Sequence, residues 1–246
     1  MSTPVKLYQQ EMHDNIGYFA TWLPGDPMAL GDVGVLQAGQ FRRFTSLKEL
    51  GIPCKLGRSG NPQRLSYSST TGTSIVSSAG AEAPGIAKAQ IAIKFSKQGA
   101  FLFQALEVQR MELANRPDVA TGILGAFEQK SWKKEWLVVD SVYRAESATI
   151  IVSEDNSAEV VLSASSALPL GSLPLADPKL GFTVSSTHGR IVHVLAASGL
   201  HPLYSCIRLK DPLFGSASVG PVRSETPERR AAQALSGLGL AELLDS

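Results

Sequence analysis

The segment Trp136–Ala164 constrains the fold more than any other part of the chain, because its apolar residues come in short blocks rich in Val and Ile. Residues of this kind favour strands over helices. We predict strands at Trp136–Ala145, Ala148–Ser153 and Ala158–Ala164, separated by short polar turns. A parallel return needs a dozen or more residues, so turns this short predict antiparallel hairpins at the centre of the sheet.

The clearest alternation of apolar and polar residues lies in Ala87–Phe95. Lysine and glutamine occupy positions between the apolar residues, and a period of two is typical of a strand with one buried face. The following segment, Ala100–Leu113, fits a longer strand but could also be written as a helix. The predicted apolar face of the first strand consists of Ala87, Ala89, Ile91, Ile93 and Phe95.

Helices are predicted in three short segments. Lys6–Ile16 has apolar residues loosely at helical spacing, and Gly17 ends it. Thr45–Leu50 contains a capping-box pattern followed by a glycine. Pro117–Gln129 begins with a proline, which favours the first helical position. Together with the strands, these segments predict an α+β fold: a single domain with a twisted, mainly antiparallel sheet and a few short helices packed on it.

The composition changes near the C-terminus. We predict a β-rich domain over residues 1–213, a flexible linker over 214–225 and a helical tail over 226–246. The linker is rich in Gly, Ser and Pro, and Arg223, Arg229 and Arg230 offer sites to trypsin-like proteases. The tail contains glycines that weaken an isolated helix, so it should need a groove in which to dock; otherwise it is a frayed chain end. Its apolar stripe consists of Ala231, Leu235, Leu238, Leu243 and Leu244.

The composition and the motif search exclude several classes of function. The chain has 23 basic and 22 acidic residues, which argues against a nucleic-acid-binding protein. Glycine-rich nucleotide loops, a nucleophile elbow and a zinc-protease motif are absent from the sequence. Cys54 and Cys206 match no metal or redox spacing. We therefore expect no enzyme activity, no catalytic residue, no cofactor and no metal.

The N-terminal sequence lacks the basic start and apolar run of a signal peptide. The sequence also contains no apolar run of about 18 residues or more, the length that a transmembrane helix needs. These features predict a cytoplasmic protein in its resting state.

The order of these segments resembles that of the bacterial gasdermins. GYFATWLP at Gly17–Pro24 resembles that family's opening Gly-Tyr-aromatic/aliphatic-Leu-Pro segment after a short N-terminal helix, and Ser46–Leu50 falls where the family has a Ser-Leu-x-x-Leu element. AQIAIKF at Ala89–Phe95 resembles its long amphipathic strand. WLVVDSVYRAESATIIVSE, which begins at Trp136, resembles its central strands. One family feature is missing, since residues 1–15 contain no cysteine that could be acylated.

The resemblance implies a pore-forming protein that acts in prokaryotic defence against viruses. In this interpretation the tail keeps the protein soluble, an unidentified protease cuts the linker, and the released chains bind membrane lipid and assemble into a large ring. The alternating strand Ala87–Phe95 would then insert into the membrane, with one face toward lipid and one toward water. The alternative is a non-enzymatic intracellular β-rich module for binding or assembly, in which the same strand is half-buried in an ordinary sheet.

Overall fold

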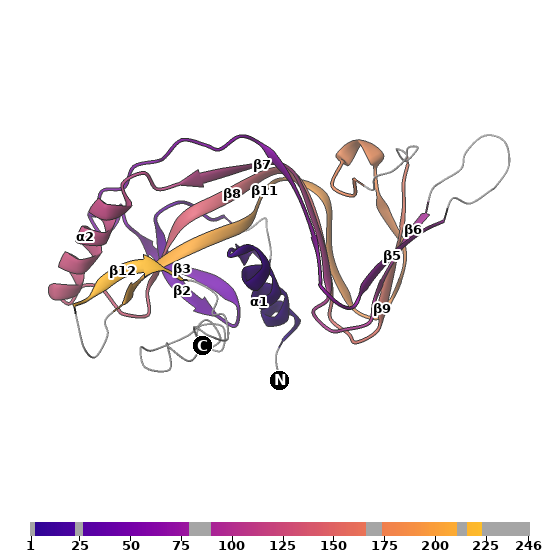
Figure 1. The fold of residues 1–246 in the computed structure, drawn as a ribbon, viewed down its shortest axis with the longest axis horizontal. Coiled ribbons are helices and arrows are strands. Elements are labelled where there is room, and N and C mark those ends of the chain that lie inside the picture. The colour runs from indigo at the N-terminus through magenta and orange to yellow at the C-terminus, as the bar shows by residue number, and fades with distance from the viewer. Residues whose placement is uncertain (1–2, 23–26, 79–89, 166–173, 211–215, 223–246) are drawn as a thin grey trace. The chain divides into compact units, whose positions relative to one another are not determined.

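The computed structural model describes residues 3–22, 27–78, 90–165, 174–210 and 216–222. Strands dominate these residues, and eight strand pairs among them are antiparallel. The predicted fold class, α+β with a mainly antiparallel sheet, is confirmed. In chain order (Figure 1) the elements are α1 (Pro4–Ile16), β1 (Phe19–Ala20), β2 (Asp32–Gln37), β3 (Gln40–Ser46), β4 (Gln63–Ser68), β5 (Thr73–Ser78), β6 (Gln90–Phe95), β7 (Phe101–Glu112), α2 (Arg116–Glu128), β8 (Leu137–Ser153), β9 (Ala158–Ser163), the short 3-10 helix η1 (Pro178–Leu180), β10 (Thr183–His188), β11 (Ile191–Lys210) and β12 (Ser218–Pro221).

The described strands form two sheets. In the large sheet, β1, β11, β8, β2 and β3 are neighbours in that order, β12 pairs with β11, and β7 pairs with both β4 and β8. In the small sheet the order is β10, β9, β6, β5. By its contacts the chain divides into two compact units, of which unit 1 contains Pro62–Val108 and Ala145–Leu200, and unit 2 contains Gln9–Asn61, Gln109–Arg144 and the part from His201 onward.

Unit 1 contains the small sheet and the parts of β4, β7, β8 and β11 that are joined to it. Its core lies between these two layers. Residues of the small sheet pack there against Leu102 of β7 and Ile151 of β8, and the segment around η1 contributes Leu175, Leu180 and Phe182. At the start of α1, the ring of Tyr8 meets that of Phe101 edge-on at a centroid distance of 4.9 Å.

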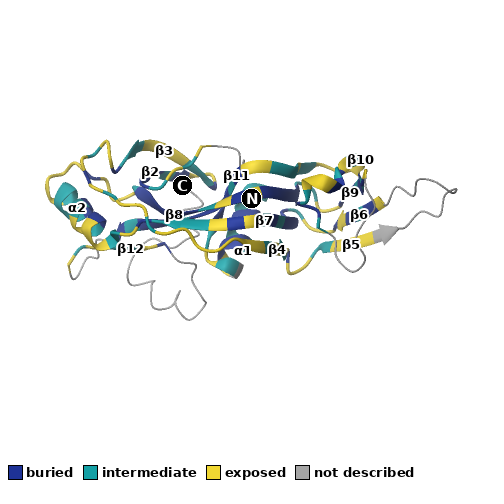
Figure 2. Cartoon of the chain, turned by 90° about the horizontal axis from the view of Figure 1, so that it is seen from above, coloured by how far each residue is buried: buried dark blue, intermediate teal, exposed yellow. Residues whose placement is uncertain are grey.

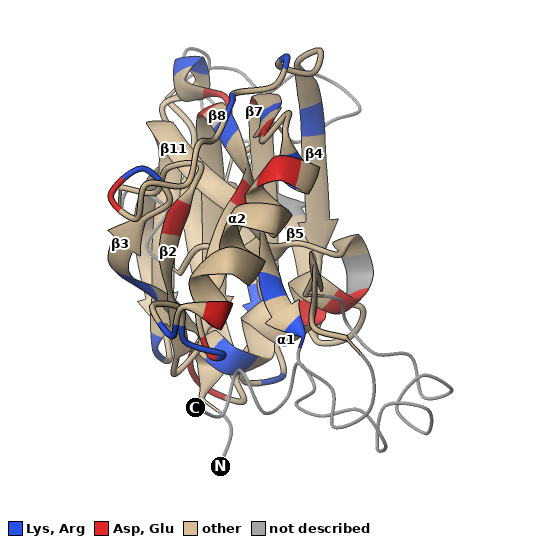
Figure 3. Cartoon of the chain, turned by 90° about the vertical axis from the view of Figure 1, so that its left-hand side faces the viewer, with Lys and Arg blue, Asp and Glu red and all other residues tan. Residues whose placement is uncertain are grey.

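Unit 2 has two apolar clusters. In one cluster Phe19 and Tyr204 stack across the β1–β11 pair, with ring centroids 5.4 Å apart. In the other, Val119 and Ile123 of α2 pack with residues of β2, β8 and β11. The predicted helix at Pro117–Gln129 is therefore present and covers the large sheet. Figure 3 shows that acidic and basic residues are interspersed around α2 and β2.

Several predicted boundaries are wrong. The strands predicted at Trp136–Ala145 and Ala148–Ser153 are one strand, β8, without a turn at Ala145–Glu146–Ser147. The strand continues through these polar residues because their side chains have hydrogen-bond partners. Ser147 donates a hydrogen bond to Ala176 O, and Thr149 donates one of 2.7 Å to Leu175 O. Since β8 and β9 lie in different sheets, the segment between them is also no hairpin turn.

The helix predicted at Thr45–Leu50 is a turn that follows β3. The expected cap still forms, because the Glu49 N–H donates to Ser46 Oγ at 3.2 Å, but Gly51 ends the turn at once with a φ of 71°. The predicted linker at 214–225 also contains order. Within it Ser218–Pro221 form β12, whose residues pair with Ile207–Lys210 of β11.

The described residues include no helix that is both long and apolar enough to cross a membrane.

Candidate functional site

The small sheet has one apolar and one polar face. On β6, Ile91 and Ile93 are completely buried and Phe95 is 2% exposed, whereas Gln90 and Lys94 are exposed. The alternation predicted for this strand is therefore present in its described part. Ala87 and Ala89, which we predicted to belong to the same face, lie outside the described residues.

The neighbouring strand β9 repeats the pattern in register. Ile93 lies opposite Val160, and both are fully buried. Lys94 lies opposite Glu159, with an ion pair of 3.8 Å between Lys94 Nζ and Glu159 Oε2. Facing residues of an antiparallel pair point to the same side of the sheet, so apolar residues meet apolar ones and charged residues meet charged ones. The two faces thus remain distinct across the sheet.

The sequence pattern predicts β6 but not which strands pair with it. The segment AEVVLS at Ala158–Ser163 carries the same alternation as β6. The sequence predicts it as part of the central meander, whereas it lies between β6 and β10 in the small sheet. The edge strands of the small sheet, β5 and β10, contain only one or two apolar residues each, so their apolar pattern is weak. Their place at the two edges of the small sheet follows from the pairing.

The edge strand β5 carries no charged residue. Ile75 is 40% exposed and Val76 is 53% exposed, and adjacent residues of a strand point to opposite faces, so both faces of this strand expose a β-branched side chain. Figure 2 shows exposed residues on β5. The opposite edge, β10, contains a histidine but no Lys, Arg, Asp or Glu. Sheets usually protect their edges with charges, prolines or bulges. Apart from a register shift between Val184 and Ser186 on β10, these two edges lack that protection.

Four chain corners connect the small sheet to the large one. They are residues 69–72 between β4 and β5, 96–100 between β6 and β7, 154–157 between β8 and β9, and 189–190 between β10 and β11. The strand order is the same on both sides of the corners: β4, β7, β8, β11 in the large sheet correspond to β5, β6, β9, β10 in the small one. In Figure 1 the strands turn back at these corners. The two strands that meet at each corner are therefore the two halves of one long strand that folds back on itself. These pairs are β4–β5, β6–β7, β8–β9 and β10–β11.

Glycines with positive φ occupy three of the described corners. Their φ angles are 91° for Gly72, 77° for Gly99 and 73° for Gly189. Side chains are unfavourable in this left-handed region, and an added Cβ at Gly189 would lie 2.6 Å from Ser157 O. The bent geometry thus depends on glycine, whereas an extended strand does not.

The polar clusters of unit 2 have an evident structural role. Asp140, which is 5% exposed, accepts a hydrogen bond from Ser205 Oγ at 2.7 Å and pairs with Arg116 at 2.8 Å. These contacts tie β8, β11 and the start of α2 together. The described residues contain no cluster of His, Cys, Asp or Glu that could hold a metal ion.

The predicted cleavage region, Arg223, Arg229 and Arg230, and the whole predicted tail lie outside the described residues. Val222 is the last described residue, and it is 7% exposed in a cluster with Tyr204 and Cys206.

No protein-family model and no curated protein sequence matches this chain. The solved structures that match this chain include two gasdermins. A bacterial gasdermin from Bradyrhizobium tropiciagri is 15% identical, with a TM-score of 0.38 over 89% of this chain and 90% of that one. The gasdermin A3 membrane pore is 12% identical, with a TM-score of 0.28 over 74% of this chain and 73% of that one. Both solved structures belong to the family that the sequence resembles, with identities below 25% and TM-scores below 0.5.

Proposed function

We propose that this chain is a gasdermin-like pore-forming protein without enzyme activity, whose small sheet enters the membrane. The observation that supports this most directly is the separation of the two faces. Transmembrane strands alternate residues toward lipid with residues toward water. The buried face of β6 and β9 offers Ile91, Ile93, Val160 and Leu162 to lipid, and the other face keeps Lys94 and Glu159 in water.

The strands of the small sheet must lengthen to cross a bilayer. Each of β5, β6, β9 and β10 has six residues, which span about 20 Å at about 3.3 Å per residue. A transmembrane strand needs about 9–11 residues. Straightening the corners would join each short strand to its continuation in the large sheet, because the strand order is the same on both sides.

The arrangement also supports self-association into a ring. An antiparallel sheet with an even number of strands ends on two strands of opposite direction, so β5 of one copy can pair antiparallel with β10 of the next copy in the same orientation. This contact joins two different surfaces, and such contacts form rings when the rotation between copies closes. The uncharged edges of β5 and β10 suit this pairing.

In this proposal the protein rests in the cytoplasm and reaches the membrane after activation. The tail after Val222 restrains it, and an unidentified protease removes the tail by cutting near Arg223, Arg229 or Arg230. A role in antiviral defence follows from the sequence resemblance. The second candidate is a binding module, and the exposed edge of β5 favours it, since an open edge strand can accept an extended peptide.

Site-specific labelling separates the two candidates. Single cysteines along β6 and β9 carry an environment-sensitive fluorophore, and the protein lacking residues 223–246 is added to liposomes that contain a quencher in their acyl chains. We expect quenching at positions 160 and 162 and none at positions 159 and 161, which alternates as the two faces do. An absence of quenching at all of these positions would contradict membrane insertion and favour the binding module.

A further inference from the structure

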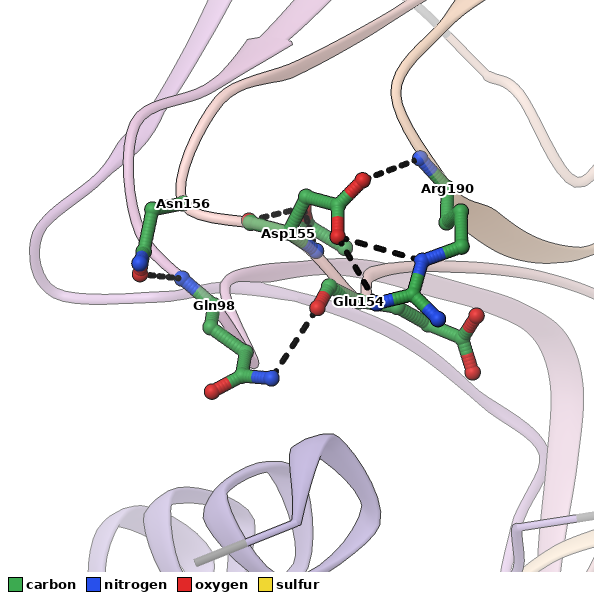
Figure 4. Close-up of polar contacts among 6 residues, drawn as sticks. Gln98, Glu154, Asp155, Asn156 and Arg190 are labelled. Carbon is green, nitrogen blue, oxygen red and sulfur yellow. Dashed lines mark hydrogen bonds and ion pairs between the residues drawn. The ribbon is translucent and has the colours of Figure 1, made fainter. Parts of the chain in front are cut away.

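An ion pair joins two of the corners at which the long strands fold over. Asp155 of the β8–β9 corner accepts hydrogen bonds from Arg190 Nε at 3.2 Å and Nη2 at 3.1 Å (Figure 4). Its other carboxylate oxygen accepts the backbone N–H of Arg190 at 2.8 Å. In return, the Glu154 N–H donates to Arg190 O at 2.9 Å. The β8–β9 and β10–β11 corners are therefore linked by side chain and backbone together.

The same segment holds a third corner. Gln98 of the β6–β7 corner donates from its side chain to Glu154 O at 3.0 Å and from its backbone N–H to Asn156 Oδ1 at 3.2 Å (Figure 4). The Gly99 N–H donates to Ser153 O at 2.8 Å. Residues 153–156 are thus the place where three folded strands are tied side by side.

The fourth corner is joined to this group through the third. The Phe101 N–H donates a hydrogen bond of 2.7 Å to Ser69 Oγ, and the Ser96 N–H donates one of 2.9 Å to Gly72 O. A continuous series of hydrogen bonds therefore runs across the corners from β4–β5 to β10–β11. None of the corners can straighten alone without breaking contacts to its neighbour.

We propose that Asp155 and Arg190 form a latch that keeps the four long strands folded at their corners. This inference rests on the proposed function, because only a chain that lengthens its strands needs to release the corners. Asp155 is the residue through which the last corner is held, since it binds both the backbone and the guanidinium of Arg190. Its loss should free the β10–β11 strand first and weaken the bonds of the other corners in turn.

The latch is suited to reversible opening. The side chain of Arg190 is 74% exposed and that of Asp155 is 33% exposed, so water competes for the same groups and the pair adds little to overall stability. Hydrogen bonds from the Arg190 backbone and then from its guanidinium hold the pKa of Asp155 below its usual value, in agreement with a carboxylate that is charged in the folded state. The restraint is therefore weak, and it lies at the corners, where the strands must straighten.

The test compares Asp155→Ala with Glu154→Gln, which removes the neighbouring carboxylate but keeps the backbone bond of Glu154. In the intact resting protein, hydrogen exchange is measured at the amides of Arg190, Glu154 and Gly99. We expect Asp155→Ala to accelerate exchange about fivefold at all three amides, which corresponds to the largest contribution usual for an exposed ion pair. We expect Glu154→Gln to leave the exchange rates of these amides unchanged. Acceleration confined to Arg190, which loses its acceptor directly, would overturn the latch.

Dye release from liposomes gives the second measurement. In a background lacking residues 223–246, Asp155→Ala should release dye about fivefold faster than the same chain with Glu154→Gln. Equal rates would overturn the latch while leaving pore formation intact. If none of the chains releases dye, the proposed function fails, and the exchange measurement alone decides whether Asp155 holds the corners.

Discussion

Ile91 of β6 lies directly opposite Leu162 of β9, and both side chains are completely buried. The adjacent pair, Gln90 and Ser163, points to the other face, where Gln90 is exposed. One step along the strand therefore moves a side chain from the core of unit 1 to solvent. In the proposed membrane form the same step moves it from lipid to water.

Ile91→Asp should lower the free energy of unfolding by roughly 3–5 kcal/mol, because it removes a core side chain and buries a charge without a partner. Gln90→Asp introduces the same charge one position away on the exposed face and should change stability by less than about 0.5 kcal/mol. Urea denaturation of both variants measures the difference. Similar values for the two would show that the faces of β6 are assigned wrongly.

Gly189→Ala should destabilise the resting protein, since its φ of 73° is unfavourable for alanine and its Cβ would lie 2.6 Å from Ser157 O. We expect a loss of about 1–3 kcal/mol. Gly125→Ala is the matched control: this glycine lies within α2 with open space around it, so alanine should stabilise the protein by about 0.5–1 kcal/mol. Thermal unfolding that shifts in the same direction for both would contradict the role of Gly189 in the bend.

Val76→Lys should prevent assembly while leaving the monomer stable, because a lysine on the exposed edge strand opposes pairing with another copy. Ala92→Lys is the control, since Ala92 lies opposite Val76 on the same face but on the inner strand β6. The two variants are compared by the size of the oligomers that the tail-less protein forms on liposomes. Full-size oligomers from Val76→Lys would rule out the β5 edge as the assembly contact.

His13 should make stability depend on pH. It is completely buried in the last turn of α1, with its ring 4.4 Å from that of Phe19, and neither ring nitrogen has a hydrogen-bond partner among the described residues. Burial lowers its pKa from 6.5 to about 4, and the backbone of Val222 acts in the opposite direction. The neutral form is therefore favoured in the folded protein.

Between the two pKa values the unfolded chain binds a proton at His13 that the folded protein does not bind. Stability is then highest above about pH 6.5 and falls as the pH is lowered toward 4, by up to about 3 kcal/mol. His13→Gln should flatten this dependence in urea denaturation between pH 4 and 7. An unchanged slope in the variant would assign the pH dependence to other groups.

Local patterns in the sequence predicted the elements whose geometry depends on neighbouring residues alone. Alternation identified β6, and a proline at the start identified α2. The split predicted within β8 was wrong because the partners of Ser147 and Thr149, the carbonyls of Ala176 and Leu175, lie far along the chain. A polar triplet without these partners would favour a turn.

The corners were not predictable for the same reason. Asp155 and Arg190 are 35 residues apart, and neither belongs to a recognisable motif. The four long strands could not be predicted either, because each contains a corner whose sequence resembles an ordinary turn. Only the equal strand order of the two sheets indicates that they are folded strands.

Dye release from liposomes by the chain ending at Val222 tests the central claim most directly. This protein keeps β12 and all four corners but lacks the predicted tail, so it should assemble and release the dye, whereas the full chain should leave the liposomes intact. Cutting the full chain at Arg223 with a trypsin-like protease should have the same effect. A chain ending at Val222 that folds, stays monomeric and leaves liposomes intact would contradict both the pore and its restraint by the tail.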